Sequence, residues 1–326
     1  MNFSVIIPTL NCASTIHRAL DSVIRAADLY DINRVEILIV DNGSSDKTIK
    51  NTQSWVRNNS TITTHLFESQ AFGPGPARNL GIMKAKYPYL LFLDSDDYFS
   101  LEIFITLNEC LKKQYYDFVF FNYTVDCAEI KQKVKKSRNL QNYSTVKSEL
   151  VRQYSSMETD NSVIAMCWTK TFLCKTNNIS FSEGIYEDIL FLGKSIVACK
   201  SYSILNQSLY FKVERLESIS NSLTLKHIYY YMKSWSQVFE LFVTKNAYLN
   251  QEIDINKGIR GAIGQMVNTV NVSDLDENFK KECRGYLAEL IERYFPQTEK
   301  IVTSSEGTRL DSLAINFIMH YAKKRE

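Results

Sequence analysis

Paired cysteines are absent from this sequence. Its seven cysteines are scattered along the chain, and none of them forms a Cys-x-x-Cys pair. Disulfide frameworks and structural zinc sites are built from cysteines at regular, close spacings, so neither is expected here. The four histidines are equally dispersed. We therefore expect free thiols and a cytoplasmic protein.

A strong net charge and long apolar runs are absent as well. The formal net charge is +2, which argues against a nucleic-acid partner bound through bulk electrostatics. No run approaches the roughly 18 apolar residues that cross a bilayer. The N-terminus has no basic leader, and residues 3–10 include Ser4, Pro8 and Thr9, so this segment is interpreted as a first strand and not as a signal peptide.

Proline is rare, and its placement changes along the chain. Four of the five prolines lie in the first 88 residues, and the fifth is Pro296. In the first part, apolar strands predicted at 3–7, 35–40, 61–67, 90–93 and 117–123 alternate with helical spacing. This alternation predicts an α/β fold with a doubly wound, parallel sheet. From about Leu223 the apolar spacing is helical, so we predict a sheet domain over 1–222 and a helical subdomain over 223–326.

The helical subdomain has apolar stripes that predict burial of one helix against another or against the main domain. Self-association of two copies through these helices is the alternative. The last helix ends in Lys323, Lys324 and Arg325. Basic residues there suit the helix dipole, and they also suit peripheral contact with the cytoplasmic face of a membrane.

Three aspartates follow one short predicted strand. The apolar residues Leu90 to Leu93 run directly into Asp94, Ser95, Asp96 and Asp97. In open α/β sheets, ligands bind beyond the carboxyl ends of the strands. Carboxylates this close repel one another unless a cation or a solvated turn relieves them. A cation site and an acidic turn that caps the next helix are therefore both open.

Two further loops bring polar groups to the same predicted edge. Asp41 ends a buried strand and could accept hydrogen bonds from a base or sugar, although the following Asn42-Gly43 also suits a turn closed by Asp41. Arg78 opens a helix beside two Gly-Pro pairs, where the guanidinium and the backbone amides would both attract an anion. A salt bridge from Arg78 to one of the aspartates is the alternative.

Four stretches in this order resemble glycosyltransferase family 2: residues 4–11 (SVIIPTLN), 36–46 (EILIVDNGSSD), 76–81 (PARNLG) and 94–97 (DSDD). The similarity extends over about residues 3 to 220. It implies a GT-A fold, which is Rossmann-like with a mostly parallel central sheet flanked by helices. It also implies a nucleotide-sugar donor, a divalent cation (Mn²⁺ or Mg²⁺), and inversion at the transferred sugar.

The resemblance also implies roles for individual residues. Thr9 and Asp41 are expected to contact the nucleobase, Asp94 the ribose, and Asp96 the metal. Arg78 is expected near the base and the diphosphate. The complete set expected to bind the donor is Pro8, Thr9, Asn11, Asp41, Arg78, Asp94, Ser95, Arg215 and Ser220, and Asp94 joins Asp96 as a metal ligand.

A second acidic pair opens a predicted helix. Glu187 and Asp188 follow Gly184, and acidic residues in a first turn favour the helix dipole in any protein. An attacking hydroxyl also needs a base for its proton. In this family context we assign Asp188 as the general base, with Glu187 beside it to orient the acceptor or a metal-bound group. Trp168 is expected either to pack under the acceptor sugar or to fill the core.

We therefore expect a metal-dependent, inverting hexosyl- or N-acetylhexosaminyltransferase. It would move one sugar, from a UDP-sugar, to a hydroxyl of a growing bacterial surface glycan, including lipid-linked ones. Capsule, lipopolysaccharide or lipooligosaccharide, and teichoic acid are the glycans considered. One alternative is a non-catalytic sugar-binding subunit, which predicts loss of carboxylates, yet Asp94, Asp96 and Asp188 are present. The other is a haloacid-dehalogenase-type phosphatase. That chemistry requires Thr or Val at the position that Tyr98 occupies here, which argues against it.

Overall fold

The computed structural model describes residues 1–71, 73–126, 140, 143–159, 162–176, 179–214, 223–246, 255–296 and 309–322. The chain divides into two compact units. The first comprises residues 1–145 and 162–216, and the second comprises residues 146–161 and 217–326. The segment 146–161 thus belongs with the helical unit, which the sequence pattern did not predict. The lysine-rich stretch 131–138 lies outside the described residues.

The described part of the first unit forms an eight-stranded mixed sheet in the order β3-β2-β1-β4-β7-β6-β8-β5. Its strands are β1 (Phe3–Thr9), β2 (Val35–Asp41), β3 (Thr63–Glu68), β4 (Tyr89–Phe92), β5 (Tyr98–Phe99), β6 (Phe118–Asp126), β7 (Met166–Thr169) and β8 (Tyr202–Val213). Pairs β1–β2, β2–β3, β1–β4 and β6–β8 are parallel, whereas β4–β7, β6–β7 and β5–β8 are antiparallel.

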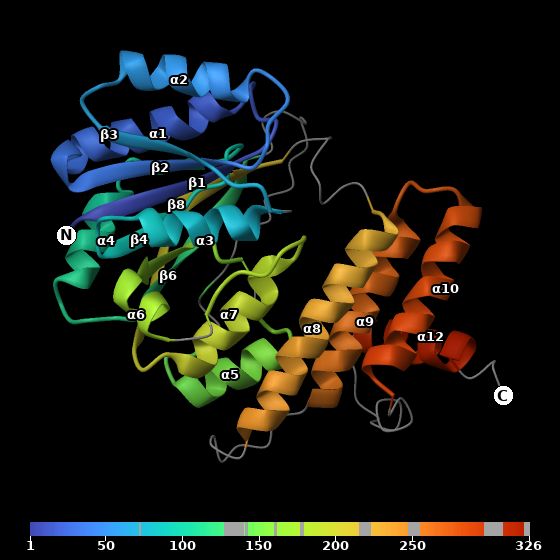
Figure 1. The fold of residues 1–326 in the computed structure, drawn as a ribbon. Coiled ribbons are helices and arrows are strands. Elements are labelled where there is room, and N and C mark those ends of the chain that lie inside the picture. The colour runs from blue at the N-terminus through green and yellow to red at the C-terminus, as the bar shows by residue number, and fades with distance from the viewer. Residues whose placement is uncertain are drawn as a thin grey trace. The chain divides into compact units, whose positions relative to one another are not determined.

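Helices flank the sheet of this unit. They are α1 (Ile16–Tyr30), α2 (Thr48–Asn58), α3 (Pro74–Lys84), α4 (Ile103–Leu111), α6 (Lys170–Lys175) and α7 (Glu187–Ala198), with a short 3₁₀ turn η1 (Ile32–Arg34). Figure 1 shows α1 and α2 on one side of β1 to β3 and α3 on the other. Accordingly, every residue of β1 and β2 is buried, as expected for strands covered on both faces. The predicted α/β architecture is confirmed, but the sheet is mixed and not wholly parallel, because β7 and β5 pair antiparallel with their neighbours.

The strand register brings the polar loops to one edge. Thr9 at the end of β1 pairs with Asp41 at the end of β2. On the other side of β1, the backbone N–H of Leu93 donates to the carbonyl of Ile6 at 3.0 Å, which continues the β1–β4 pairing beyond Phe92. The loops after β1, β2 and β4 therefore leave the sheet at the same edge, as predicted.

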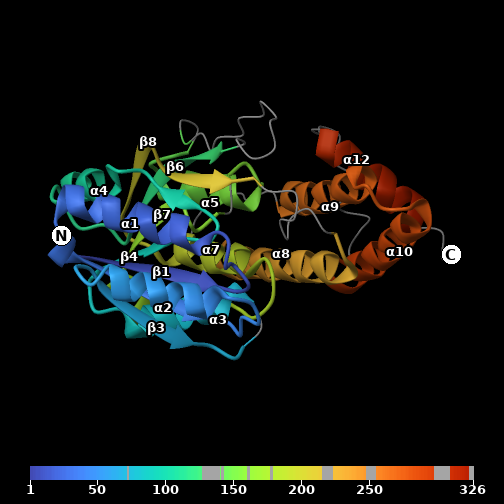
Figure 2. The same ribbon diagram turned by 90° about the horizontal axis from the view of Figure 1, so that it is seen from above.

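The second unit is helical. Its helices are α5 (Lys147–Ser155), α8 (Leu225–Asn246), α9 (Ile255–Val272), α10 (Glu277–Tyr294) and α12 (Arg309–Phe317), followed by a π-helical turn η4 (Ile318–Ala322). Figures 1 and 2 show α8, α9 and α10 side by side. Trp235 of α8 is fully buried, and its ring centroid lies 5.7 Å from that of Tyr154 on α5. The apolar stripes predicted from the sequence thus bury against one another within this unit.

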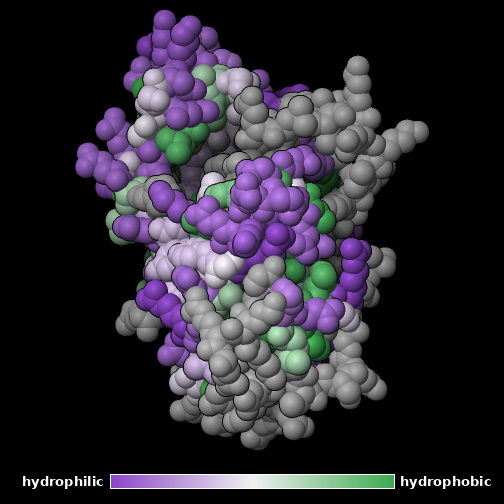
Figure 3. Space-filling view, turned by 90° about the vertical axis from the view of Figure 1, so that its right-hand side faces the viewer, coloured by the Kyte–Doolittle hydropathy of each residue, from purple (hydrophilic) through white to green (hydrophobic). Residues whose placement is uncertain are grey.

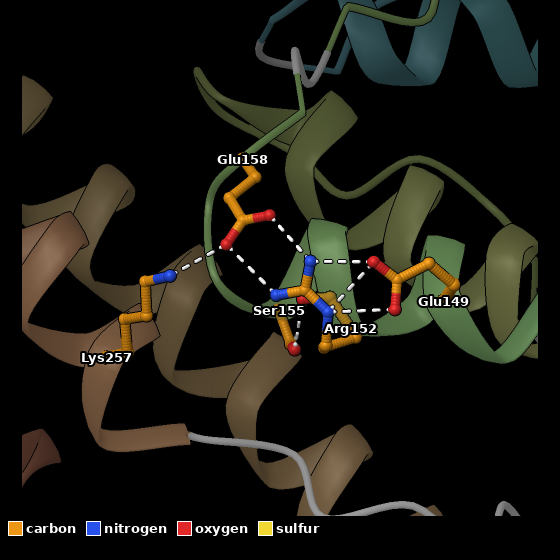
Figure 4. A network of polar contacts seen from close by, with 5 residues as sticks. All are labelled: Glu149, Arg152, Ser155, Glu158 and Lys257. Atoms are coloured by element: carbon orange, nitrogen blue, oxygen red, sulfur yellow. Dashed lines mark hydrogen bonds and ion pairs between the residues drawn. The ribbon is translucent and has the colours of Figure 1, made fainter. Parts of the chain in front are cut away.

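The segment 146–161 is attached to α9 by polar groups as well (Figure 4). Arg152 donates to Glu149 at 2.7 Å and to Glu158 at 2.8 Å, and Lys257 of α9 donates to Glu158 at 2.7 Å. Gly258 lies so close that a Cβ atom there would clash with the carbonyl oxygen of Ser155. This close approach is possible because residue 258 is glycine and has no side chain.

The described surface of the helices has isolated apolar residues. In the face shown in Figure 3, hydrophilic residues dominate, and hydrophobic ones form small separate groups. Val243, Val272 and Met319 are exposed apolar side chains of this unit. No described helix combines the length and apolar character needed to cross a membrane. Self-association and membrane-surface contact stay predictions, and Lys323, Lys324 and Arg325 lie outside the described residues.

Candidate functional site

The loops after β1 and β2 are tied together around Asp41. Its buried carboxylate accepts hydrogen bonds from the Thr9 hydroxyl (3.1 Å), the Gly43 and Ser44 backbone N–H groups (3.0 and 2.9 Å) and the Ser44 hydroxyl (2.6 Å). The turn closed by the Asp41 side chain, one of the two alternatives considered from the sequence, is therefore present. A nucleobase contact by Asp41 stays a prediction, and it requires exchange of one of these bonds.

Asn11 joins the same two loops. Its backbone has a positive φ of 48°, a conformation that asparagine adopts more readily than most residues. Its side-chain Oδ1 accepts from the Ser45 backbone N–H at 2.9 Å, and its own N–H donates to the Ser44 hydroxyl at 3.0 Å. The Asn42 side chain in turn donates to the carbonyl of Gly73 at 2.9 Å. These hydrogen bonds thus connect the loops that follow β1, β2 and β3.

The start of α3 lies against the segment that precedes α7. A Cβ atom at Gly73 would clash with the Gly184 carbonyl, and one at Gly75 would clash with the carbonyl of Ser182. The Asn79 side chain exchanges two hydrogen bonds with the backbone of Phe181, at 2.9 and 3.0 Å. The two Gly-Pro pairs noticed in the sequence therefore allow close backbone approach, which brings Arg78 to the first turn of α7.

Arg78 links the acidic strand end to the acidic pair on α7. Its guanidinium donates to Asp94 at 2.8 Å and to Glu187, and the Arg78 side chain is only 5% exposed. Burial alone would lower the pKa of Arg78, but Asp94 and Glu187, together with Asp188, raise it above its usual value. The salt-bridge alternative is confirmed for Asp94, and the partner Glu187 was not predicted.

Aromatic rings pack against the Arg78 guanidinium. The Arg78 guanidinium carbon lies 5.4 Å from the ring centroid of Phe181 and 6.0 Å from that of Phe92. Trp168 contributes to the same apolar layer through Phe191, at a centroid distance of 5.1 Å, and is 0% exposed. Trp168 therefore fills the core, and the acceptor role considered for it is corrected, because a fully buried ring offers no face to a sugar.

The two acids on α7 differ in their surroundings. Tyr186, with a positive φ of 60°, turns the chain into the helix. Glu187 is 6% exposed and occupied by Arg78, whereas the Asp188 side chain is only half-buried. Asp188 is thus the more exposed acid of this pair.

The acidic strand end is a turn closed by its own backbone. The Asp97 N–H donates to the Asp94 carbonyl at 3.0 Å. The Asp97 carboxylate is 2% exposed and accepts from the Tyr210 hydroxyl at 2.6 Å and from the Val213 N–H at 2.8 Å. Burial raises the pKa of Asp97, and the neighbouring Asp96 and Asp94 raise it further. Asp97 is thus a buried partner of β8, and Asp94, Ser95 and Asp96 form the accessible part of the turn.

Sequence reasoning missed Tyr210. Its side chain is fully buried, and burial raises the pKa of its hydroxyl, with Asp97 adding to the effect. A hydroxyl-bearing ring within the apolar run at the end of β8 was the available signal, because a buried tyrosine hydroxyl needs a polar partner. The partner itself lies more than 100 residues away in the sequence, so the pattern could not identify it.

The accessible part of the turn offers the right atoms for a hard cation. Mg²⁺ and Mn²⁺ prefer oxygen ligands, and magnesium sites commonly combine one or two carboxylates with substrate phosphates. Asp94 and Asp96 supply such carboxylates, although Asp94 shares its charge with Arg78. In the parts of the chain that the structure describes, no three His, Cys, Asp or Glu side chains gather around a metal position. The residues therefore fit a cation held by one or two carboxylates, with substrate phosphates and water completing its coordination.

Two residues expected to bind the donor, Arg215 and Ser220, lie outside the described residues. The others gather at one sheet edge: Pro8 and Thr9 at the end of β1, Asn11 after it, Asp41 at the end of β2, Arg78 on α3, and Asp94 and Ser95 after β4. Their contacts to a donor stay predictions. The structure brings them together with Glu187 and Asp188 through Arg78.

Comparison with known proteins gives relatives over much of the chain. The family model described as Glycosyl transferase family 2 matches residues 4–179. Cholesterol galactosyltransferase of Borreliella burgdorferi is 26% identical over 232 residues, which is 69% of this chain and 63% of that protein. Poly(ribitol-phosphate) beta-N-acetylglucosaminyltransferase TarS of Staphylococcus aureus is 26% identical over 220 residues, 67% of this chain and 36% of that protein. The chain therefore spans less than two thirds of either relative.

Solved structures are similar over the whole chain. S. aureus TarS 1–349 in complex with UDP-GlcNAc has a TM-score of 0.64 at 20% identity and covers 100% of this chain and 91% of that one. The mannosyltransferase PcManGT from Pyrobaculum calidifontis, in complex with GDP-Man and Mn²⁺, has a TM-score of 0.54 at 15% identity, with coverages of 100% and 88%. These likenesses establish the GT-A fold. Because the family match also covers more than half of its residues, the chain belongs to glycosyl transferase family 2.

Proposed function

We propose that this protein transfers one sugar from a UDP-sugar to a hydroxyl of a bacterial surface glycan, with inversion and with the help of Mn²⁺ or Mg²⁺. The observation that carries the proposal is the position of Arg78. It joins Asp94, on the side where a donor would bind, to Glu187, which is adjacent to the proposed base. The proposed donor site and the proposed base site thus share the buried guanidinium of Arg78.

The donor half of the proposal assigns Thr9, Asp41 and Arg78 to the nucleotide, together with Pro8, Asn11 and Ser95 around them. Asp94 would face the ribose, and Asp94 and Asp96 would hold the cation. Departure of a nucleoside diphosphate develops negative charge on phosphate oxygens, and a bound divalent cation neutralises that charge. Arg215 and Ser220 are proposed to contact the diphosphate. UDP is favoured because the similar TarS structure contains UDP-GlcNAc.

The base half assigns proton removal to Asp188. An acceptor hydroxyl must lose its proton as it attacks the anomeric carbon, and a positioned carboxylate can accept it. The half-buried Asp188 is reachable, whereas Glu187 is buried against Arg78. Glu187 then holds the first turn of α7 in place. The acceptor is proposed to be a surface glycan, with lipid-linked glycans and teichoic acid among the candidates; the relative TarS, named as a poly(ribitol-phosphate) beta-N-acetylglucosaminyltransferase, supports a surface polymer.

A thermal-shift screen tests this function. UDP, GDP and a panel of their sugars are each added with Mn²⁺ and with EDTA. A ligand that binds only the folded protein raises its free energy of unfolding by RT ln(1 + L/Kd), where L is the free ligand concentration. We expect UDP-sugars to stabilise the protein with Mn²⁺ and to be slowly hydrolysed. If no nucleotide or nucleotide sugar stabilises the protein under either condition, the proposed function is wrong.

A further inference from the structure

The four-residue acidic turn meets one buried hydroxyl at both of its ends. The Tyr210 hydroxyl donates to the Asp97 carboxylate at 2.6 Å and accepts from the backbone N–H of Asp94 at 3.2 Å. Asp94 and Asp97 are the first and last residues of the turn, which their own backbone hydrogen bond closes. A single oxygen atom on β8 therefore fixes both ends of the turn.

The surroundings leave this hydroxyl little freedom. Tyr210 is 0% exposed, and its ring packs edge-on against Phe99, with centroids 5.8 Å apart. The second oxygen of Asp97 accepts from the Val213 backbone N–H at 2.8 Å, three residues after Tyr210 on β8. A buried, bonded network of this kind is rigid, because an unpaired polar group here would lose its hydrogen bond without gaining water.

The opposite side of the turn is held by α1. The Arg18 guanidinium donates to the backbone carbonyl of Asp96 at 2.6 Å, and the Ser22 hydroxyl accepts from the Phe99 N–H at 3.1 Å. These bonds restrain the backbone of residues 96–99, but they do not touch Asp94. Arg78 holds the Asp94 carboxylate, and the contact from β8 holds the Asp94 backbone N–H, so the placement of the Asp94 backbone relative to Asp96 depends on the β8 side.

We propose that the Tyr210 hydroxyl is a positioning group that sets the angle at which Asp94 and Asp96 meet a metal-bound nucleoside diphosphate. The inference rests on the function proposed above. Groups behind the first ligands of a metal site orient those ligands, and their removal typically costs about 10- to 100-fold in metal affinity or activity. Tyr210 touches neither the cation nor the donor in this account; it acts through the turn.

Tyr210→Phe tests the proposal, because it keeps the ring and removes only the hydroxyl. The probe is UDP, titrated calorimetrically into the full-length protein with Mn²⁺ and again with EDTA. We expect UDP affinity with Mn²⁺ to fall about tenfold and affinity in EDTA to change less than about twofold. An unchanged UDP affinity with Mn²⁺ in a folded Tyr210→Phe protein overturns the proposal.

Tyr202→Phe is the matched control. Tyr202 lies on the same strand, and its hydroxyl donates to the Ser144 carbonyl at 2.7 Å, away from the acidic turn. The hydroxyl of Tyr202 makes one bond from a half-buried position, so its loss should lower thermal stability less than Tyr210→Phe does and should leave UDP affinity unchanged. If both variants weaken UDP binding with Mn²⁺ equally, a general loss of stability explains the effect, and the positioning role is wrong.

Asp97→Asn gives an independent check. An amide at this position can still accept from Val213, but it no longer accepts the Tyr210 proton as a carboxylate does. Because the two residues act through one hydrogen bond, the double variant should weaken UDP binding less than the sum of the single effects. Fully additive losses overturn the proposal. If the wild-type protein binds no nucleoside diphosphate at all, the proposed function itself fails.

Discussion

Arg78 and Glu187 form a buried ion pair between two helices whose residues lie 109 positions apart in the sequence. Their side chains are 5% and 7% exposed. The pair exists because glycines at 73 and 75 let the start of α3 approach the segment before α7. It places the proposed base beside the acidic turn.

Loss of Arg78 should therefore be costly to the fold. Arg78→Met leaves Glu187 buried without its cation, and breaking a buried pair in this way destabilises a protein by about 3–5 kcal/mol. Arg34→Met is the control, since the Arg34–Asp31 pair is 53% and 38% exposed and such surface pairs contribute up to about 1 kcal/mol. Urea denaturation measures both. Equal losses would contradict a structural role for the buried pair.

Asp96 should matter only when a metal is present. Asp96→Asn removes a proposed carboxylate ligand, so Mn²⁺-dependent UDP affinity should fall by at least about tenfold. UDP affinity in EDTA should stay close to that of the wild type. Asp28→Asn, at an exposed position of α1, provides a control with the same change in charge. Calorimetric titration that shows equal Mn²⁺ dependence in all three proteins would remove Asp96 from the metal site.

Two glycines in the helical unit should respond to alanine in opposite directions. At Gly258 a Cβ atom would clash with the Ser155 carbonyl and lie 2.7 Å from a ring carbon of Phe239. Overpacking of this kind costs about 1–3 kcal/mol. At Gly285 a Cβ atom has no neighbour within 4 Å, and alanine should add about 0.5–1 kcal/mol of helix stability. Thermal unfolding that showed the same sign for both variants would contradict the packing of residue 155 against α9.

The ion-pair network around Glu158 predicts a pH dependence of stability. Hydrogen bonds from Arg152 lower the pKa of Glu158 from its usual 4.5 to about 2, against partial burial, and Lys257 adds to the lowering. A lowered carboxyl pKa contributes stability above the unfolded-state value, and this contribution disappears as the pH falls through the folded-state value. Glu158→Gln should therefore cost about 1 kcal/mol at neutral pH, after allowance for solvent screening of this partly exposed group.

The stability difference between wild type and Glu158→Gln should shrink as the pH falls from 4.5 towards 2. Glu240→Gln, at an exposed position of α8, controls for the general effect of losing a carboxylate. Denaturation at a series of pH values measures the difference. A constant difference over this range would show that the network does not act through the charge of Glu158.

Local patterns in the sequence were sufficient for the parallel half of the fold. The buried strands β1, β2 and β4 are short apolar runs, and each ends at the polar residues that were singled out. The short strands β5 and β7 carry too few residues for a period to be recognised, and β7 contains the buried Trp168. The attachment of α5 and the residues after it to the helical unit depends on contacts of Tyr154 with Trp235 and of Glu158 with Lys257, which lie far along the chain.

The same distinction holds at the candidate site. Asp94, Asp96, Arg78 and Asp188 were recognisable because motifs of known order carry them. The burial of Asp97 was not, because it depends on β8 lying beside the acidic turn, with Tyr210 as its partner. Likewise, Glu187 could be recognised as an acid at a helix start, but its pairing with Arg78 is a property of the folded chain.

Donor turnover by Asp188→Asn tests the central claim most directly. The rate of UDP release is measured with the UDP-sugar that the wild type uses, beside the affinity for that donor, with Glu183→Gln at an exposed neighbouring position as the control. If Asp188 is the general base, turnover falls by roughly 10²–10⁴-fold, while donor affinity stays within about twofold of the wild-type value. Wild-type turnover in Asp188→Asn would contradict the assignment of Asp188 as the base.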